Sequence, residues 1–101
     1  MKFKIKKPKS ISLMFPLYKD KMTVKSMILK SLKVLKKTKL KFEIVIIDDG
    51  CPENSGKIAK EMSKHNSNIK VHFHRKNLGY GAAVKTGLRN CRYECIFATD
   101  G

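Results

Sequence analysis

The stretch FEIVIIDDGCPENSG, residues 42–56, joins a nearly continuous apolar run to two adjacent carboxylates, a glycine and a cluster of turn formers. A short apolar run that ends abruptly in turn residues predicts a strand buried on both faces, as in a parallel sheet covered by helices. Only eight of the 101 residues are acidic. The pairing of Asp48 with Asp49 at the end of the most apolar strand therefore indicates a specific role for this pair.

Strands and helices alternate along the rest of the chain. Strands are predicted at residues 11–15, 42–47, 69–76 and 93–99, and helices at residues 24–37 and 55–66. Residues 77–90 predict a glycine-rich entry followed by a third helix. We expect Pro16 to end the first strand, because proline donates no hydrogen bond to a ladder. The order βαβαβαβ is typical of an α/β fold with a mostly parallel sheet and helices on both faces.

Polar side chains follow three of the predicted strands. Tyr18 and Asp20 come after the first strand, Asp48 and Asp49 end the second, and Asp100 follows the fourth. Parallel sheets bind ligands beyond the carboxyl ends of their strands, where the strand order reverses. Carboxylates there can accept hydrogen bonds from a nucleobase or a ribose, or hold a divalent metal on a diphosphate. The alternative is that one of the pair, or both, only cap a helix or shape the turn.

The glycine-rich segment GYGAAVKTG, residues 79–87, matches neither the dinucleotide fingerprint nor the phosphate loop. Glycines of this kind suit close packing of a helix against a sheet. Lys85, one helical turn beyond Gly81, either points toward a phosphate in the same crevice or lies in solvent, and both alternatives stay open.

Composition indicates a small globular domain, residues 10–101, behind a basic leader, residues 1–9. The chain has no apolar run near the ~18 residues that a membrane-spanning helix needs, and its leader has no apolar signal region. We therefore expect a cytoplasmic chain. The spacing of its three cysteines favours neither a disulfide framework nor a zinc site, and His72 and His74 are expected on the outer face of a strand.

The net charge of +15 is concentrated in the N-terminal part, where residues 1–41 hold 14 lysines and one acidic residue. This charge has several possible explanations: solvated helix faces, an anionic membrane surface, a phosphorylated substrate, or nucleic acid. The 20 lysines outnumber the three arginines and have few aromatic neighbours, which fits a base-reading surface poorly. We therefore expect no nucleic-acid partner, and peripheral contact with an anionic membrane stays open.

Four segments in order, ISLMFPLYKD, IVIIDDGCPENS, NLGYGAAVKTGL and FATDG, resemble family 2 glycosyltransferases of GT-A fold. The resemblance is to the dolichol-phosphate mannosyltransferase-like, polyprenyl-phosphate sugar transferase branch and covers roughly residues 10–101. It implies a Rossmann-like nucleotide-binding half that takes a UDP- or GDP-linked sugar as donor. It also implies a polyprenyl phosphate as the acceptor, at the inner face of the membrane.

The resemblance implies roles for residues around the nucleobase. Pro16, Tyr18 and Asp20 match the family's first-strand motif, which surrounds the base. Asp49 matches the aspartate that hydrogen-bonds the base, whereas Asp48 matches a more structural position.

Two further residues match positions near the donor phosphates. Lys85 lies in the helix whose basic residue approaches them, and Asp100 matches the first aspartate of the Asp-x-Asp motif, which binds Mg²⁺ or Mn²⁺. The sequence departs from the family at Cys51, where serine is usual, and it lacks the second aspartate of the metal motif. We therefore expect an incomplete metal site and a chain that is inactive by itself. The alternatives are a catalytically inert nucleotide-binding module and a basic nucleic-acid-binding protein.

Overall fold

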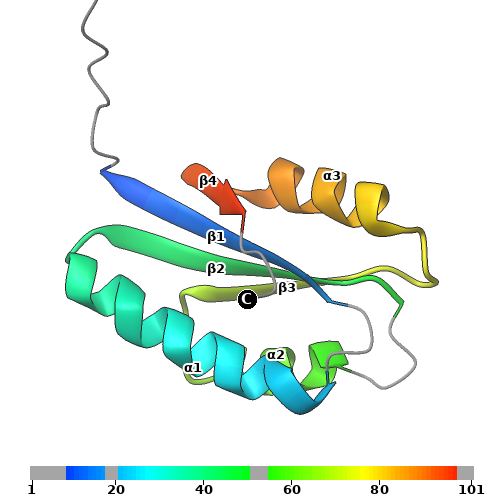
Figure 1. Ribbon diagram of the computed structural model, residues 1–101, viewed down its shortest axis with the longest axis horizontal. Coiled ribbons are helices and arrows are strands. Elements are labelled where there is room, and N and C mark those ends of the chain that lie inside the picture. Colours follow the sequence, from blue (N-terminus) through cyan, green and yellow to red (C-terminus); the bar gives the residue numbers. More distant parts are fainter. Residues whose placement is uncertain (1–8, 18–20, 51–54, 98–101) are drawn as a thin grey trace, which may run out of the picture.

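The computed structural model describes residues 9–17, 21–50 and 55–97 (Figure 1). In chain order they form β1 (Ser10–Leu17), α1 (Lys21–Thr38), β2 (Lys41–Asp48), α2 (Ser55–Ser63), β3 (Ile69–Phe73), α3 (Tyr80–Asn90) and β4 (Glu94–Phe97). The predicted alternation of strands and helices is therefore confirmed.

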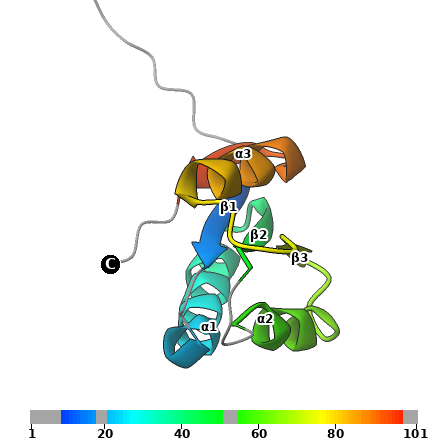
Figure 2. The ribbon, with the colours of Figure 1, turned by 90° about the vertical axis from the view of Figure 1, so that its right-hand side faces the viewer.

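The strands of the described ranges form one parallel sheet in the order β3-β2-β1-β4. The chain moves outward from β1 to β2 and β3, then returns across the sheet to place β4 on the other side of β1. Helices α1 and α2 cover one face and α3 covers the other (Figure 2). This is the predicted Rossmann-like arrangement, and its strand order reverses between β1 and β4.

The first strand is longer than predicted, because β1 continues through Pro16 to Leu17. The backbone amide of Asp49 donates to the carbonyl of Leu17 at 3.0 Å, so Leu17 directs its polar backbone groups toward β2. Successive residues of a strand alternate in direction, so Pro16 turns its nitrogen toward the β4 side. The described pairing between β1 and β4 extends to Met14 and Phe97. The missing N–H of Pro16 therefore breaks no ladder hydrogen bond among the described residues, and β1 continues through it.

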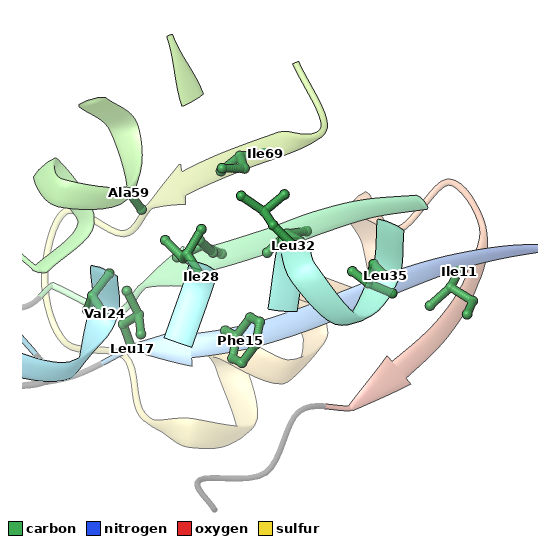
Figure 3. Packing of buried hydrophobic residues seen from close by; sticks show 11 residues of the cluster. Ile11, Phe15, Leu17, Val24, Ile28, Leu32, Leu35, Ala59 and Ile69 are labelled. Carbon is green, nitrogen blue, oxygen red and sulfur yellow. The ribbon is translucent and has the colours of Figure 1, made fainter. Parts of the chain in front are cut away.

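The larger core lies between the sheet and helices α1 and α2 (Figure 3). Its apolar stripe on α1 consists of Val24, Ile28, Leu32 and Leu35, all buried, as the helical spacing predicts. The lysines of α1 from Lys25 to Lys37 lie on its exposed faces. None of the described helices is long and apolar enough to cross a bilayer.

A smaller core lies under α3 and consists of Met14, Val45, Ile47 and Ala83. Because β2 contributes to both cores, its central residues are buried on both faces, as predicted from the apolar run. Helix α3 approaches the sheet closely at Gly87, where a Cβ atom would overlap the side chain of Met14. The predicted packing role of the glycines is thus confirmed for Gly87.

Candidate functional site

The carboxyl edge of the sheet brings together the end of β2, the loop between β3 and α3, and the first turns of α2 and α3. Two buried carboxylates stand at its centre, since Asp48 and Asp49 are each 4% exposed. Buried charges require hydrogen-bond donors. The partners of these two side chains therefore decide what the edge can do.

Asp48 stabilises the start of α2. Its Oδ2 accepts a hydrogen bond from the backbone amide of Gly56 at 2.9 Å. A carboxylate at a helix N-terminus satisfies an amide that has no partner within the helix and interacts favourably with the helix dipole. A Cβ atom at position 56 would overlap the Asp48 carboxylate, so glycine is needed there.

Asp49 holds the loop between β3 and α3. Its Oδ1 accepts from the backbone amide of Leu78 at 2.9 Å and contacts His74 Nδ1 at 2.8 Å. Its Oδ2 accepts from the backbone amide of Gly79 at 3.0 Å and from Asn77 Nδ2 at 3.1 Å. Each oxygen thus accepts two hydrogen bonds from the protein, which is the usual capacity of a carboxylate oxygen.

His74 connects Asp49 to helix α3. An ionised carboxylate only accepts hydrogen bonds, so Nδ1 of His74 carries the proton directed at Asp49. Its Nε2 lies 2.7 Å from the hydroxyl oxygen of Thr86. The side chain of His74 is only 10% exposed.

The prediction that His74 lies on the outer face of a strand is therefore wrong. Strand β3 ends at Phe73, and the backbone amide of His74 donates to the carbonyl of Asp48. The alternation of apolar residues and histidines does not extend past the end of the strand. His72, which lies within β3, is half-buried, and burial lowers its pKa although the charge of Glu43 raises it.

The hydrogen bonds of Asp49 outweigh its burial in setting its charge state. Burial alone would raise the pKa of Asp49, but the hydrogen bonds from His74, Leu78 and Gly79, with the charge of His74, hold the pKa below its usual value. The carboxylate is therefore ionised at neutral pH and keeps its acceptor role.

Gly50 completes the edge. Its φ of 66° lies in the left-handed region that favours glycine. A Cβ atom at this position would overlap the backbone of Lys76. The Asp-Asp-Gly sequence therefore allows the β3–α3 loop to lie directly against the end of β2.

Besides Asp48 and Asp49, the structure describes two of the predicted site residues. Pro16 is half-buried near the end of β1, and Lys85 is exposed on α3. Tyr18, Asp20 and Asp100 lie outside the described residues.

Sequence reasoning missed His74 and Asn77 as members of this edge. Asn77 begins the segment NLGYGAAVKTGL, which resembles the family, whereas polar character after β3 was the only signal for His74.

The described part of the chain does not form a metal centre. It contains no group of three or more histidine, cysteine, aspartate or glutamate side chains that could hold an ion. The Asp49 carboxylate, which lies at the predicted edge, is already occupied by protein donors. The described side chains alone therefore do not fit a divalent metal.

Comparison with a known structure supports the fold. A mannosyltransferase from Pyrobaculum calidifontis, solved in complex with GDP-Man and Mn²⁺, superposes with a TM-score of 0.64 at 15% sequence identity. The match covers 87% of this chain and 26% of that chain.

Comparison of sequences identifies the family. An uncharacterized glycosyltransferase, EpsJ of Bacillus subtilis, is 35% identical over 68 residues, which are 67% of this chain and 20% of that protein. A dolichyl-phosphate beta-glucosyltransferase of Dictyostelium discoideum is 32% identical over 97 residues, covering 89% of this chain and 30% of that protein. The chain thus spans less than a third of the length of these relatives. The family model for glycosyl transferase family 2 matches residues 12–101, and the chain belongs to that family.

Proposed function

We propose that this chain binds a nucleotide-diphospho-sugar at the carboxyl edge of its sheet, where the strand order reverses between β1 and β4. The observation that carries the proposal is this reversal in a parallel sheet of a glycosyltransferase family member. Residues 16–20 end or follow β1, and Asp100 follows β4 in the chain. Pro16, Tyr18 and Asp20 would surround the base, and Lys85 would approach the phosphates.

In this proposal, Asp48 and Asp49 shape the donor site. Base recognition by Asp49 would require a base N–H to replace one of its present donors. Asn77 is the candidate for release, because its side chain is exposed and the other donors include the backbone amides of Leu78 and Gly79. Asp48 would keep α2 in place beside the base.

The whole enzyme, in this proposal, transfers the sugar to a polyprenyl phosphate at the inner face of a membrane. One relative is named for dolichyl phosphate, a lipid phosphate of this class. A phosphate acceptor is already ionised at neutral pH and needs little help from a general base. Dependence on Mg²⁺ or Mn²⁺, with Asp100 as one ligand, is part of the proposal, and a structural neighbour was solved with Mn²⁺.

Titration of the chain with UDP and GDP, with and without Mn²⁺, tests the donor site. We expect backbone amide NMR signals of Gly79, Tyr80 and Gly81 to shift on nucleotide addition. Absence of any shift with either nucleotide would contradict the proposal.

Two other functions are separated by further measurements. A nucleic-acid-binding protein, suggested by the net charge of +15, would bind a random oligonucleotide with a steep salt dependence and bind neither nucleotide. An inert nucleotide-binding module would bind nucleotide, yet the full-length protein would transfer no sugar.

A further inference from the structure

A buried carboxylate outside the donor site lacks part of its hydrogen bonding. Glu43, near the amino end of β2, is 3% exposed. Its Oε2 accepts from the hydroxyl of Ser12 at 2.7 Å and from the backbone amide of Arg92 at 2.6 Å. Its Oε1 is buried and has no hydrogen-bond partner within the described part of the chain. Such an oxygen favours the approach of a donor.

Basic side chains surround this carboxylate. A cavity of about 510 Å³ lies at the β3 edge of the sheet and is bordered by Glu43. Its lining includes residues from the last turns of α2 and α3. These two helices lie on opposite faces of the sheet (Figure 2). The cationic lining of the cavity consists of Lys60, Lys70, Arg89 and Arg92. A second cavity of about 170 Å³ is also lined by Glu43, Lys70 and Arg92.

The four cations have no carboxylate partner of their own, because none of them forms an ion pair among residues 9–17, 21–50 and 55–97. Lys60 and Arg89 lie in the last turns of α2 and α3, where a cation complements the helix dipole. Lys70 and Arg92 have no such role. These two residues and Glu43 line both cavities and form the centre of the candidate site.

This combination of charges selects for a particular chemistry. Lysine and arginine donate hydrogen bonds to an anion, whereas an ionised carboxylate accepts hydrogen bonds and donates none. A ligand that satisfies both must be an anion that also carries a hydrogen-bond donor. Hydrogen phosphate has an O–H group at neutral pH, and a phosphorylated sugar or polyol adds hydroxyl groups, whereas sulfate has neither.

We propose that the cavity at Glu43, Lys70 and Arg92 binds a phosphate that carries a hydroxyl donor, as inorganic phosphate or as the phosphate monoester of a sugar or polyol, whose own hydroxyl is the donor. Its anionic oxygens accept from Lys70 and Arg92, and its O–H donates to Oε1 of Glu43 after a small shift of that side chain opens the oxygen to the cavity. The site is distinct from the donor site, which lies at the opposite, carboxyl end of β2.

The test compares phosphate with sulfate at pH 7 and equal ionic strength, using the ¹⁵N-labelled chain. We expect the amide signals of Lys70, Arg92 and Tyr93 to shift, with phosphate binding at least about tenfold more tightly than sulfate, because a site built for a ligand O–H discriminates against an analogue without it. Equal affinities, or shifts confined to Gly79 and Gly81 near the donor site, would overturn the proposal. Glycerol 3-phosphate in a third titration distinguishes a monoester from the free ion.

Two variants test whether Glu43 is the reason that phosphate binds more tightly than sulfate. Glu43→Gln keeps one acceptor oxygen for Ser12 and Arg92 but directs an NH₂ group at the ligand. The ratio of the phosphate affinity to the sulfate affinity should therefore fall to about one. Glu61→Gln removes the same charge from an exposed position on α2 and should leave the preference unchanged.

The Lys70→Gln variant tests the site without altering the buried carboxylate of Glu43. It should weaken binding of phosphate and sulfate alike, and unchanged affinities would count against the site even if Glu43→Gln failed to fold. A Glu43→Gln protein that folds and still prefers phosphate would also refute the role of Glu43.

Discussion

Asp49 connects three separate parts of the chain through one side chain. Its carboxylate accepts from the loop residues His74, Asn77, Leu78 and Gly79, and His74 continues the contact to Thr86 on α3. The second aspartate of the pair therefore has a role in the fold whatever it does toward a ligand.

Replacing Asp49 by asparagine should destabilise the protein. The asparagine NH₂ group would face buried donors, and one unsatisfied buried group costs about 1–3 kcal/mol. Urea unfolding of the variant should show a loss in this range. Glu61→Gln, which breaks only an exposed ion pair with Lys64, is the matched control and should change stability by less than about 1 kcal/mol.

The contribution of Asp49 should depend on pH. Its pKa in the folded protein lies below the ordinary value of 3.8, so the unfolded chain binds a proton there more readily than the folded one. The stabilisation is therefore fully present above pH 3.8 and is lost as the pH falls through the lower folded value. The difference in unfolding free energy between the parent chain and Asp49→Asn should shrink as acid is added. A difference that stays constant down to acid unfolding would contradict this assignment.

Nucleotide binding provides a separate comparison of the two aspartates. If the base replaces one donor of Asp49, Asp49→Ala should weaken UDP or GDP binding more than Asp48→Ala, by about 10-fold to 150-fold for one charge-assisted hydrogen bond. Calorimetric titration of both folded variants measures this. Equal and negligible losses would restrict both carboxylates to shaping the edge.

The residue types at this edge were more predictable than their partners. Asp48, Asp49 and Gly50 stand out by chemistry and position alone. Their partners in the β3–α3 loop depend on tertiary contact across 25 or more residues, and no local pattern marks such contacts. His74 was misassigned for the same reason, since its environment changes where β3 ends.

Helix α3 approaches the sheet closely at one glycine, Gly87. Gly87→Ala should destabilise the protein by about 1–3 kcal/mol, because the added methyl group overlaps Met14 and forces the helix outward. Gly81→Ala is the control, since a Cβ atom there meets nothing within 4 Å. In that variant the better helix propensity of alanine should give a neutral effect or a gain of up to about 1 kcal/mol. Thermal or urea unfolding of both variants checks the contrast.

Helix α1 offers a test of membrane contact. If the chain contacts an anionic leaflet, the exposed lysines of α1 would each contribute about 1 kcal/mol near the surface. We expect sedimentation with anionic vesicles at low salt, reduced in 0.15 M salt, where the screening length is about 8 Å. Changing Lys30, Lys33, Lys36 and Lys37 to glutamine should abolish most of it. Undiminished sedimentation of the folded quadruple variant would assign these lysines to solvation alone.

At the scale of the whole molecule, the chain represents 20% to 30% of the length of its relatives. We expect the 101-residue chain to transfer no sugar from UDP- or GDP-linked donors to a polyprenyl phosphate. Radiolabelled transfer assays with either donor class measure this, with a full-length family 2 glycosyltransferase as the positive control. Turnover by the chain alone would show that residues 1–101 suffice for the reaction.

The architecture was predictable to a greater depth than the site. Alternating apolar patterns and the buried run at residues 42–47 led to the parallel sheet, because periodicity reports which faces are covered. The extension of β1 through Pro16 was not predicted. It depends on which neighbouring strand the nitrogen of Pro16 faces, and the residues of β1 alone do not specify that.

Pro16 also sets the hydrogen-bonding character of the end of β1. On the side of β1 that faces β4, its backbone nitrogen carries no proton. No substitution in a neighbouring strand can supply that missing proton. At this position β1 can therefore accept a main-chain hydrogen bond on its β4 side but can never donate one, whatever side chains surround it.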